Sequence, residues 1–193
     1  MNRFSGTLAT ILVLAGCTFG RSFDVPPDEQ LVLGRTTDSE LRARLGAPVT
    51  MERVGWNEHA LTAWTYFQGS RNGVSASHAA GTTPTRGLTL YFLKGLLVGY
   101  DRWSSFKEGH TDFDDGQIGG LLQGASTKKD VTDRLGPATG RYGYPMLRTP
   151  SHDGLTWTYL HLEGARIFRK HVVLTVDADG RIVDLEYRSI GPN

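Results

Sequence analysis

The chain has 193 residues, of which 39% are hydrophobic and 21% are charged, and its formal net charge is +1. This composition is that of an ordinary globular protein, and the nearly neutral charge argues against a dedicated nucleic-acid binder. The cationic pairs Lys128–Lys129 and Arg169–Lys170 are isolated, so we expect them to be solvated surface charge.

The N-terminus has the layout of a bacterial lipoprotein signal. An arginine precedes the apolar stretch Leu8–Ala15, which is far shorter than the roughly 20 residues that a membrane-spanning helix needs. The motif "LAGC" at Leu14–Cys17 resembles a lipobox, which implies cleavage before Cys17 and acylation of that residue. Cys17 is the only cysteine, so an internal disulfide is excluded. We predict a signal peptide over residues 1–16, lipid attachment at Cys17 and a tether over residues 17–27.

One pattern then occurs twice, at Thr36–Pro48 and again at Ser126–Ala138. Each copy predicts a short helix that starts at a capping threonine with an acid three residues later. Two apolar residues four apart form its buried stripe, and a glycine in the left-handed region ends it. The matched positions are Thr37/Thr127, Glu40/Asp130, Leu41/Val131, Leu45/Leu135 and Gly46/Gly136.

Alternating segments rich in aromatic and β-branched residues follow each helix and predict antiparallel strands. "DADGRIV" near Gly180 is typical of a hairpin turn. We therefore predict an α+β protein made of two tandem units, each a short helix pair packed on a three- to four-stranded antiparallel sheet. The expected domains are a first unit over 28–106 with a flexible loop at 69–87, a linker at 107–116, and a second unit over 117–190.

The repeated pattern resembles the SmpA/OmlA (BamE-like) family of small outer-membrane lipoproteins. The helix motifs above carry the resemblance, together with a Trp and a Tyr in the next strand of each half: Trp64 and Tyr66, then Trp157 and Tyr159. Two units in tandem look like the β-lactamase-inhibitor protein fold, with a concave sheet surface. The resemblance implies an outer-membrane protein facing the periplasm, with an envelope partner from the barrel-assembly machinery. Thr18 agrees, because retention in the inner membrane usually uses Asp after the lipidated cysteine.

Motifs for catalysis or metal binding are lacking in the sequence. None of the six histidines has a metal-ligand spacing, and "HTDFDDGQ" (His110–Gln117) does not fit a calcium loop because its glycine comes one residue early. "STKK" (Ser126–Lys129) lacks the partner motifs of a penicillin-binding site. We therefore expect no enzyme activity, no cofactor and no metal.

A protein-binding face is the remaining hypothesis. Strand parity places the aliphatic residues of each sheet toward the helices and the aromatic residues outward, where they would anchor a partner. The face would consist of Trp64, Tyr66, Tyr91, Trp103, Trp157, Tyr159 and His161. Two functions follow from such a face. The favoured one is a lipid-anchored, non-catalytic scaffold for envelope proteins, and the alternative is an inhibitor or regulator of a periplasmic enzyme.

Overall fold

The computed structural model describes residues 18–70, 76–124 and 127–191. It contains a nine-stranded antiparallel sheet in the order β1-β3-β4-β5-β6-β7-β8-β9, with β2 also paired to β3. The strands are β1 (Thr18–Gly20), β2 (Thr50–Trp56), β3 (His59–Ser70), β4 (Thr85–Leu93), β5 (Leu96–Ser104), β6 (Gly140–Tyr142), β7 (Asp153–Glu163), β8 (Arg166–Val176) and β9 (Ile182–Ile190). The helices are α1 (Asp38–Leu45), α2 (Ile118–Gly124) and α3 (Lys128–Leu135), with 3-10 turns η1 (Asp28–Gln30) and η3 (Asp115–Gln117).

The predicted fold class is wrong, because the strands form one continuous sheet instead of two separate helix-on-sheet units. The short strand β6 makes the connection: Gly99–Asp101 of β5 pair with its one edge, and Gly154–Thr156 of β7 pair with its other edge. A strand edge exposes unpaired backbone N–H and C=O groups. Joining the two halves through β6 satisfies those groups along three residues of each inner edge, which separate units would leave open.

The helix ends follow the sequence prediction closely. Thr37 and Thr127 both form complete capping boxes, with Glu40 and Asp130 respectively. Gly46 and Gly136 end the helices with φ of 76° and 80°. These features depend only on residues close in sequence, and all of these predictions are confirmed.

All three α-helices cover one face of the sheet. Directly paired residues share a face, so the pairings of Tyr100 with Arg141 and of Arg141 with Leu155 trace this face across the junction. Under α1 lies one core cluster, which contains Leu41, Leu45, Trp64, Tyr66, Leu88, Leu90, Phe92, Leu97 and Tyr100. Under α2 and α3 lies another, which contains Ile118, Leu121, Val131, Leu135, Leu155, Trp157, Tyr159, Val172 and Leu174.

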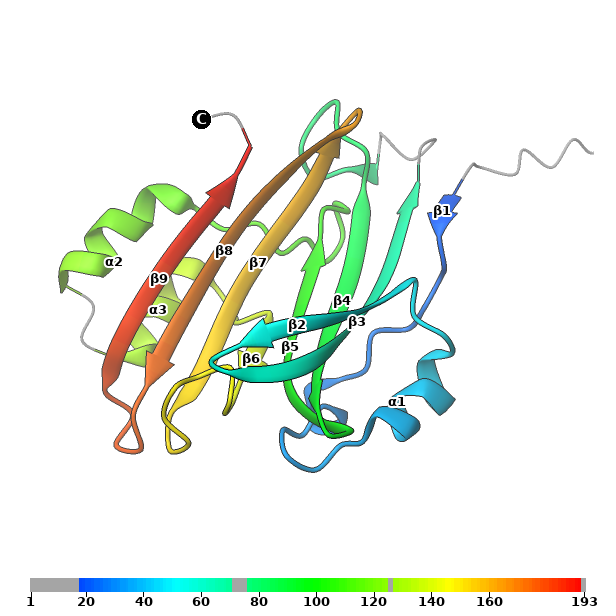
Figure 1. The fold of residues 1–193 in the computed structure, drawn as a ribbon. Helices are drawn as coiled ribbons and strands as arrows, with labels where there is room; N and C mark the ends of the chain where they lie inside the picture. The colour runs from blue at the N-terminus through cyan, green and yellow to red at the C-terminus, as the bar shows by residue number, and fades with distance from the viewer. Residues whose placement is uncertain (1–17, 71–75, 125–126, 192–193) are drawn as a thin grey trace, which may run out of the picture.

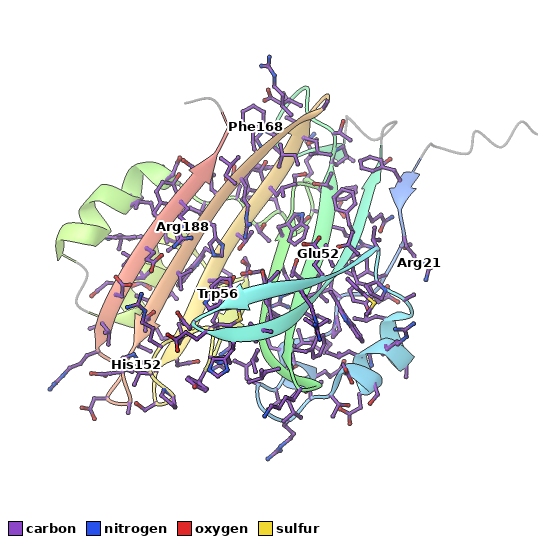
Figure 2. The ribbon with its side chains drawn as sticks, viewed as in Figure 1. Arg21, Glu52, Trp56, His152, Phe168 and Arg188 are labelled. Atoms are coloured by element: carbon purple, nitrogen blue, oxygen red, sulfur yellow. The ribbon has the colours of Figure 1, made fainter. Side chains whose placement is uncertain are left out.

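The opposite face is curved, and the β2–β3 hairpin crosses in front of it (Figure 1). A third cluster fills the space beneath the hairpin and is formed by Leu61, Val98, Tyr142, Met146 and Leu147, with Trp56 and Tyr91 packed against it. Figure 2 shows Trp56 near the tip of this hairpin, with Arg188 on β9 across the face from it.

The expected connecting segments pack more closely than predicted. Residues 18–20 of the predicted tether pair with β3, and Phe23 is buried in the core under α1. Within the described part of the predicted 69–87 loop, Ser77 and Thr82 are buried and Thr83 bridges to Leu162. The predicted linker 107–116 contributes Phe113 to the core under α2 and α3.

Candidate functional site

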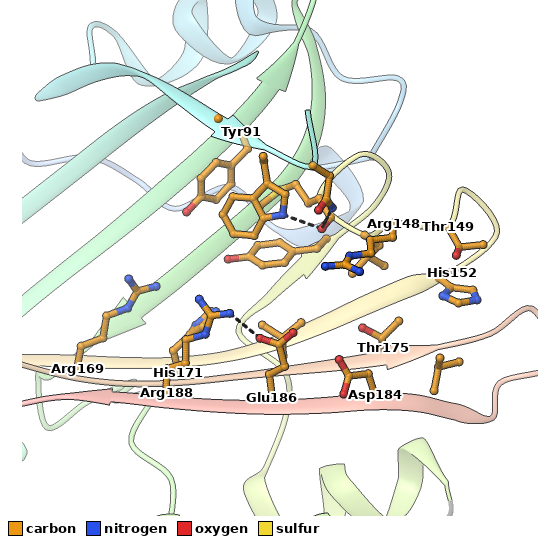
Figure 3. A pocket seen from close by; sticks show the side chains of 18 of the residues that line it. Tyr91, Arg148, Thr149, His152, Arg169, His171, Thr175, Asp184, Glu186 and Arg188 are labelled. Carbon is orange, nitrogen blue, oxygen red and sulfur yellow. Dashed lines mark hydrogen bonds and ion pairs between the residues drawn. The ribbon is translucent and has the colours of Figure 1, made fainter. Parts of the chain in front are cut away.

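A cleft of about 980 Å³ lies on the helix-free face and is the candidate site. One wall comes from the β2–β3 turn, from Tyr91 and Tyr142, and from the segment 146–149. The floor comes from β8 and β9. It consists of Arg169, His171, Val173 and Thr175 of β8, and of Val183, Asp184, Glu186, Arg188 and Ile190 of β9. In Figure 3, the side chains of Arg169, His171 and Glu186 rise from these strands toward the wall that holds Tyr91.

The wall is held in place by hydrogen bonds across the mouth of the hairpin. The indole Nε1 of Trp56 donates to the carbonyl oxygen of Met146 at 2.8 Å, and Asn57 Nδ2 donates to that of Pro145 at 2.8 Å. Trp56 also packs edge-on against Tyr91 and Tyr142, with ring centroids 6.1 and 5.8 Å away. Edge-to-face aromatic pairs add stability beyond their burial. The wall is therefore a pre-formed surface.

A buried carboxylate lies beneath this aromatic wall. Asp101 of β5 is 1% exposed, and it accepts hydrogen bonds from the hydroxyls of Tyr142, Thr156 and Thr158. The bonds from Thr156 and Thr158 to Oδ1 measure 2.6 and 3.3 Å. Asp101 pairs with Gly140, the first residue of β6, at the junction between β5 and β7. Several donors satisfy the charge, as a buried carboxylate requires.

Burial and this carboxylate together raise the pKa values of two neighbouring phenols. Burial is the main cause that raises the pKa of both Tyr91 and Tyr142, and the negative charge of Asp101 raises both pKa values further. Both phenols are therefore neutral at physiological pH, and the hydroxyl of Tyr142 is held as a donor to Asp101.

The same network orients His171. Its Nδ1 lies 2.8 Å from the hydroxyl oxygen of Thr158, and that hydroxyl donates to Asp101. A threonine hydroxyl has one proton, so Thr158 must accept from His171 when it donates to Asp101. We assign the proton of His171 to Nδ1 on this basis, since hydrogen positions follow from the network. The other ring nitrogen, Nε2, is then a hydrogen-bond acceptor.

Burial lowers the pKa of His171 from its usual 6.5, and the positive charges of Arg169 and Arg188 lower it further. Asp101 and Glu186 act in the opposite direction, but the net shift is downward. The imidazole is therefore neutral at pH 7. A neutral ring is what the assigned acceptor role of Nε2 requires.

Two arginines of the floor differ in their partners. Arg188 forms an ion pair with Glu186 at 2.7 Å. Within the described residues, the guanidinium of Arg169 has no hydrogen-bond or ion-pair partner, although it is only partly exposed. Its positive charge acts to lower the pKa of His171 and the pKa of Tyr91. Arg169 thus places a positive charge in the cleft that no described residue neutralises through an ion pair or a hydrogen bond.

The predicted aromatic binding face is wrong for most of its members. Five of the seven side chains are 1–8% exposed: Trp64, Tyr66, Trp103, Trp157 and Tyr159. The aliphatic residues Leu88 and Leu90 of β4 do point toward the helices as predicted, but the parity of β3 and β7 is the reverse of the prediction. Helices of eight residues cover little area, and large aromatic rings fill the space beneath them.

The other two members of that face are partly exposed. Tyr91 lines the cleft. His161 instead stacks on Phe168 on the helix-covered face, with ring centroids 4.8 Å apart. Cys17 lies outside the described residues, so lipid attachment stays a prediction.

Sequence reasoning missed the floor of the cleft. The sequence predicts solvated surface charge at Arg169 and Lys170, but these residues point to opposite faces of β8. Arg169 lines the cleft, whereas Lys170 is tied to Asp112 at 2.6 Å and to the carbonyl of Phe113 at 2.7 Å. The sequence did contain a signal for this floor. Buried aliphatic residues of β8 alternate with Arg169, His171, Val173 and Thr175, which therefore share the other face.

Comparisons with protein-family models, with curated proteins and with solved structures found no match. Across the described residues, no cluster of three or more His, Cys, Asp or Glu side chains is arranged to hold a metal ion. In the same part of the chain, no helix has both the length and the apolar character to cross a membrane.

Proposed function

We propose that this protein is a lipid-anchored, non-catalytic binding protein of the bacterial cell envelope, and that its cleft holds an extended segment of a partner protein. The observation that carries the proposal is the cleft itself. Arg169, without an ion-pair partner among the described residues, lies across from a wall fixed by Trp56 and Tyr91.

The dimensions of the cleft support a segment rather than a flat interface. Its volume of about 980 Å³ is at the upper end of the range typical of small-ligand sites. The floor runs along two neighbouring strands, so an extended chain laid on it meets residues at every second position. The floor combines the apolar side chains of Val173, Val183 and Ile190 with charged and polar ones, which gives both contact area and specificity.

The lipid anchor supports the envelope as the place of action. The lipobox predicts acylation of Cys17, and two or more acyl chains give stable membrane attachment. A tethered binder meets partners at the same surface at a high effective concentration. The motifs shared with BamE-like lipoproteins make barrel-assembly components the first partners to test.

A photo-crosslinking amino acid at Thr175, on the cleft floor, tests the proposal in intact cells. We expect a discrete protein adduct from Thr175 and none from Lys129, an exposed residue of α3 on the other face. The absence of an adduct at Thr175, or equal adducts at both positions, would contradict the proposed function. An adduct with a soluble hydrolase would instead support the inhibitor alternative.

A further inference from the structure

The cleft floor presents two unused recognition groups side by side on one strand. Arg169 and His171 are two residues apart on β8, so they share a face and their Cα atoms are about 7 Å apart. The guanidinium of Arg169 is a forked donor suited to a carboxylate. Nε2 of His171 is an acceptor, because Asp101 and Thr158 fix the proton on Nδ1.

Few chemical groups satisfy both residues at once. An anion alone would satisfy Arg169 and leave the acceptor of His171 unused. A neutral backbone segment would satisfy His171 through an N–H but leave the arginine without a counter-charge. The end of a peptide chain offers both, because its terminal carboxylate lies next to the N–H of the last residue.

The surroundings indicate which way such a chain end would point. Arg188 is already paired with Glu186, and Asp184 lies further along β9, opposite Thr175. A terminal carboxylate is attracted by the cation at the Arg169 end of the floor and repelled by the carboxylate of Asp184. Arg148 lines the cleft from the other wall, and His152 stands at the end near Thr175 (Figure 3).

We propose that the cleft recognises the free C-terminus of a partner peptide. Its carboxylate binds the Arg169 guanidinium, the N–H of its last residue donates to Nε2 of His171, and its last side chain packs against Trp56 and Tyr91. This inference rests on the proposed function and adds the chemical feature that the partner segment presents.

Peptide pools test the carboxylate. Randomised N-acetyl pentapeptides are applied to the immobilised full chain, once as free acids and once as C-terminal amides, and the retained peptides are identified by mass spectrometry. We expect selective retention of acids, and at least tenfold weaker binding of the matching amide by calorimetry. A charge-assisted bidentate pair commonly accounts for such a factor.

A depsipeptide tests the second contact. In this analogue of a retained peptide, an ester oxygen replaces only the last amide N–H. The wild-type protein should bind it several-fold more weakly than the peptide, whereas His171→Phe should bind both equally. If that variant fails to fold, the loss on the wild-type protein alone decides this point.

Matched variants locate the carboxylate contact. Arg169→Gln should lose the preference for acid over amide, while Arg166→Gln, an exposed change on the same strand outside the cleft, should keep it. Equal retention of acids and amides would overturn the inference, and so would displacement of the peptide by an equal concentration of inorganic phosphate. Either result leaves the crosslink at Thr175 unaffected, so this inference and the proposed function fail separately.

Discussion

The indole Nε1 of Trp157 donates a hydrogen bond to the carbonyl oxygen of Gly136, at 2.9 Å. The first half of the chain repeats the arrangement with different chemistry: the hydroxyl of Tyr66 donates to the carbonyl oxygen of Gly46, at 3.0 Å. Helices α1 and α3 therefore each end at a glycine whose carbonyl oxygen accepts a hydrogen bond from a buried ring of the sheet. On the helix-covered face, Tyr66 and Trp157 thus find acceptors for their polar atoms. Among the described residues, the buried Nε1 of Trp64 and the buried hydroxyl of Tyr159 have no hydrogen-bond partner.

Truncation of these rings should destabilise the fold strongly. We expect Tyr66→Ala and Trp157→Ala each to lower the free energy of unfolding by about 3–5 kcal/mol, because each leaves a large cavity in a core. Trp157→Phe should cost less, mainly the hydrogen bond and the unpaired Gly136 carbonyl, or about 1–3 kcal/mol. Urea unfolding of the purified mature domain measures the differences. Unchanged stability of the alanine variants would contradict the burial of these rings.

The helix-ending glycines should resist substitution because of their backbone conformation. Gly136 has φ of 80°, and a Cβ at this position would meet no atom within 4 Å, so the penalty is strain rather than a clash. We expect Gly136→Val to cost more than about 1 kcal/mol, since a β-branched residue fits the left-handed region poorly.

Gly119 in α2 is the matched control. A Cβ at this position would also meet open space, but the φ of Gly119 is not positive. Gly119→Ala should therefore be neutral or stabilise by up to about 1 kcal/mol, because alanine favours the helix. Thermal melts that show a loss of stability for Gly136→Val and no loss for Gly119→Ala distinguish strain from a general intolerance of side chains.

The sequence predicted the parts of this fold that depend on neighbouring residues. The caps at Thr37 and Thr127 and the positive φ of Gly46 and Gly136 are local, so the pattern contained them. The continuous sheet is not local. It depends on the three residues of β6 pairing with strands on both sides, and "GRY" is too short to show alternation.

The candidate site was harder to predict for a related reason. Alternation in β8 separates Arg169 and His171 from Val172 and Leu174, but it does not say which set the helices cover. The role of His171 depends on Asp101, 70 positions earlier in the chain, through a hydroxyl on a third strand. Such a relay exists only after β5, β7 and β8 have paired.

Acid should weaken the protein through His171. Its pKa in the folded state lies below the usual 6.5, so near that pH the unfolded chain binds more protons than the folded chain. The contribution of this residue is therefore fully present above pH 6.5 and is lost as pH falls toward the folded pKa. Urea unfolding at several pH values from 7.5 to 5.5 should show a smaller loss for His171→Gln than for the wild type. A steeper loss in the variant would contradict the lowered pKa.

One substitution in the predicted signal should remove the predicted membrane anchor. The motif before Cys17 and the absence of any other cysteine predict acylation at this position. Cys17→Ala should abolish metabolic labelling with a radioactive fatty acid and shift the protein from the membrane fraction to the soluble fraction. A mutant that still incorporates the label would contradict the lipoprotein prediction.

Loss of the buried carboxylate should change both stability and the protonation of His171. Asp101→Asn replaces an acceptor of several hydroxyl protons with an amide that must also donate, so we expect the free energy of unfolding to fall by about 1–3 kcal/mol.

In the wild type, long-range ¹H–¹⁵N NMR should find the proton of His171 on Nδ1, because the hydroxyl of Thr158 donates to Asp101 and accepts from His171. In Asp101→Asn the amide can donate to Thr158, which lets that hydroxyl donate to Nδ1 and moves the ring proton to Nε2. The exposed variant Asp133→Asn should leave both the stability and the His171 spectrum unchanged. A wild-type spectrum with the proton on Nε2 would show that the cleft presents a donor at this position, and the peptide N–H contact would then be excluded.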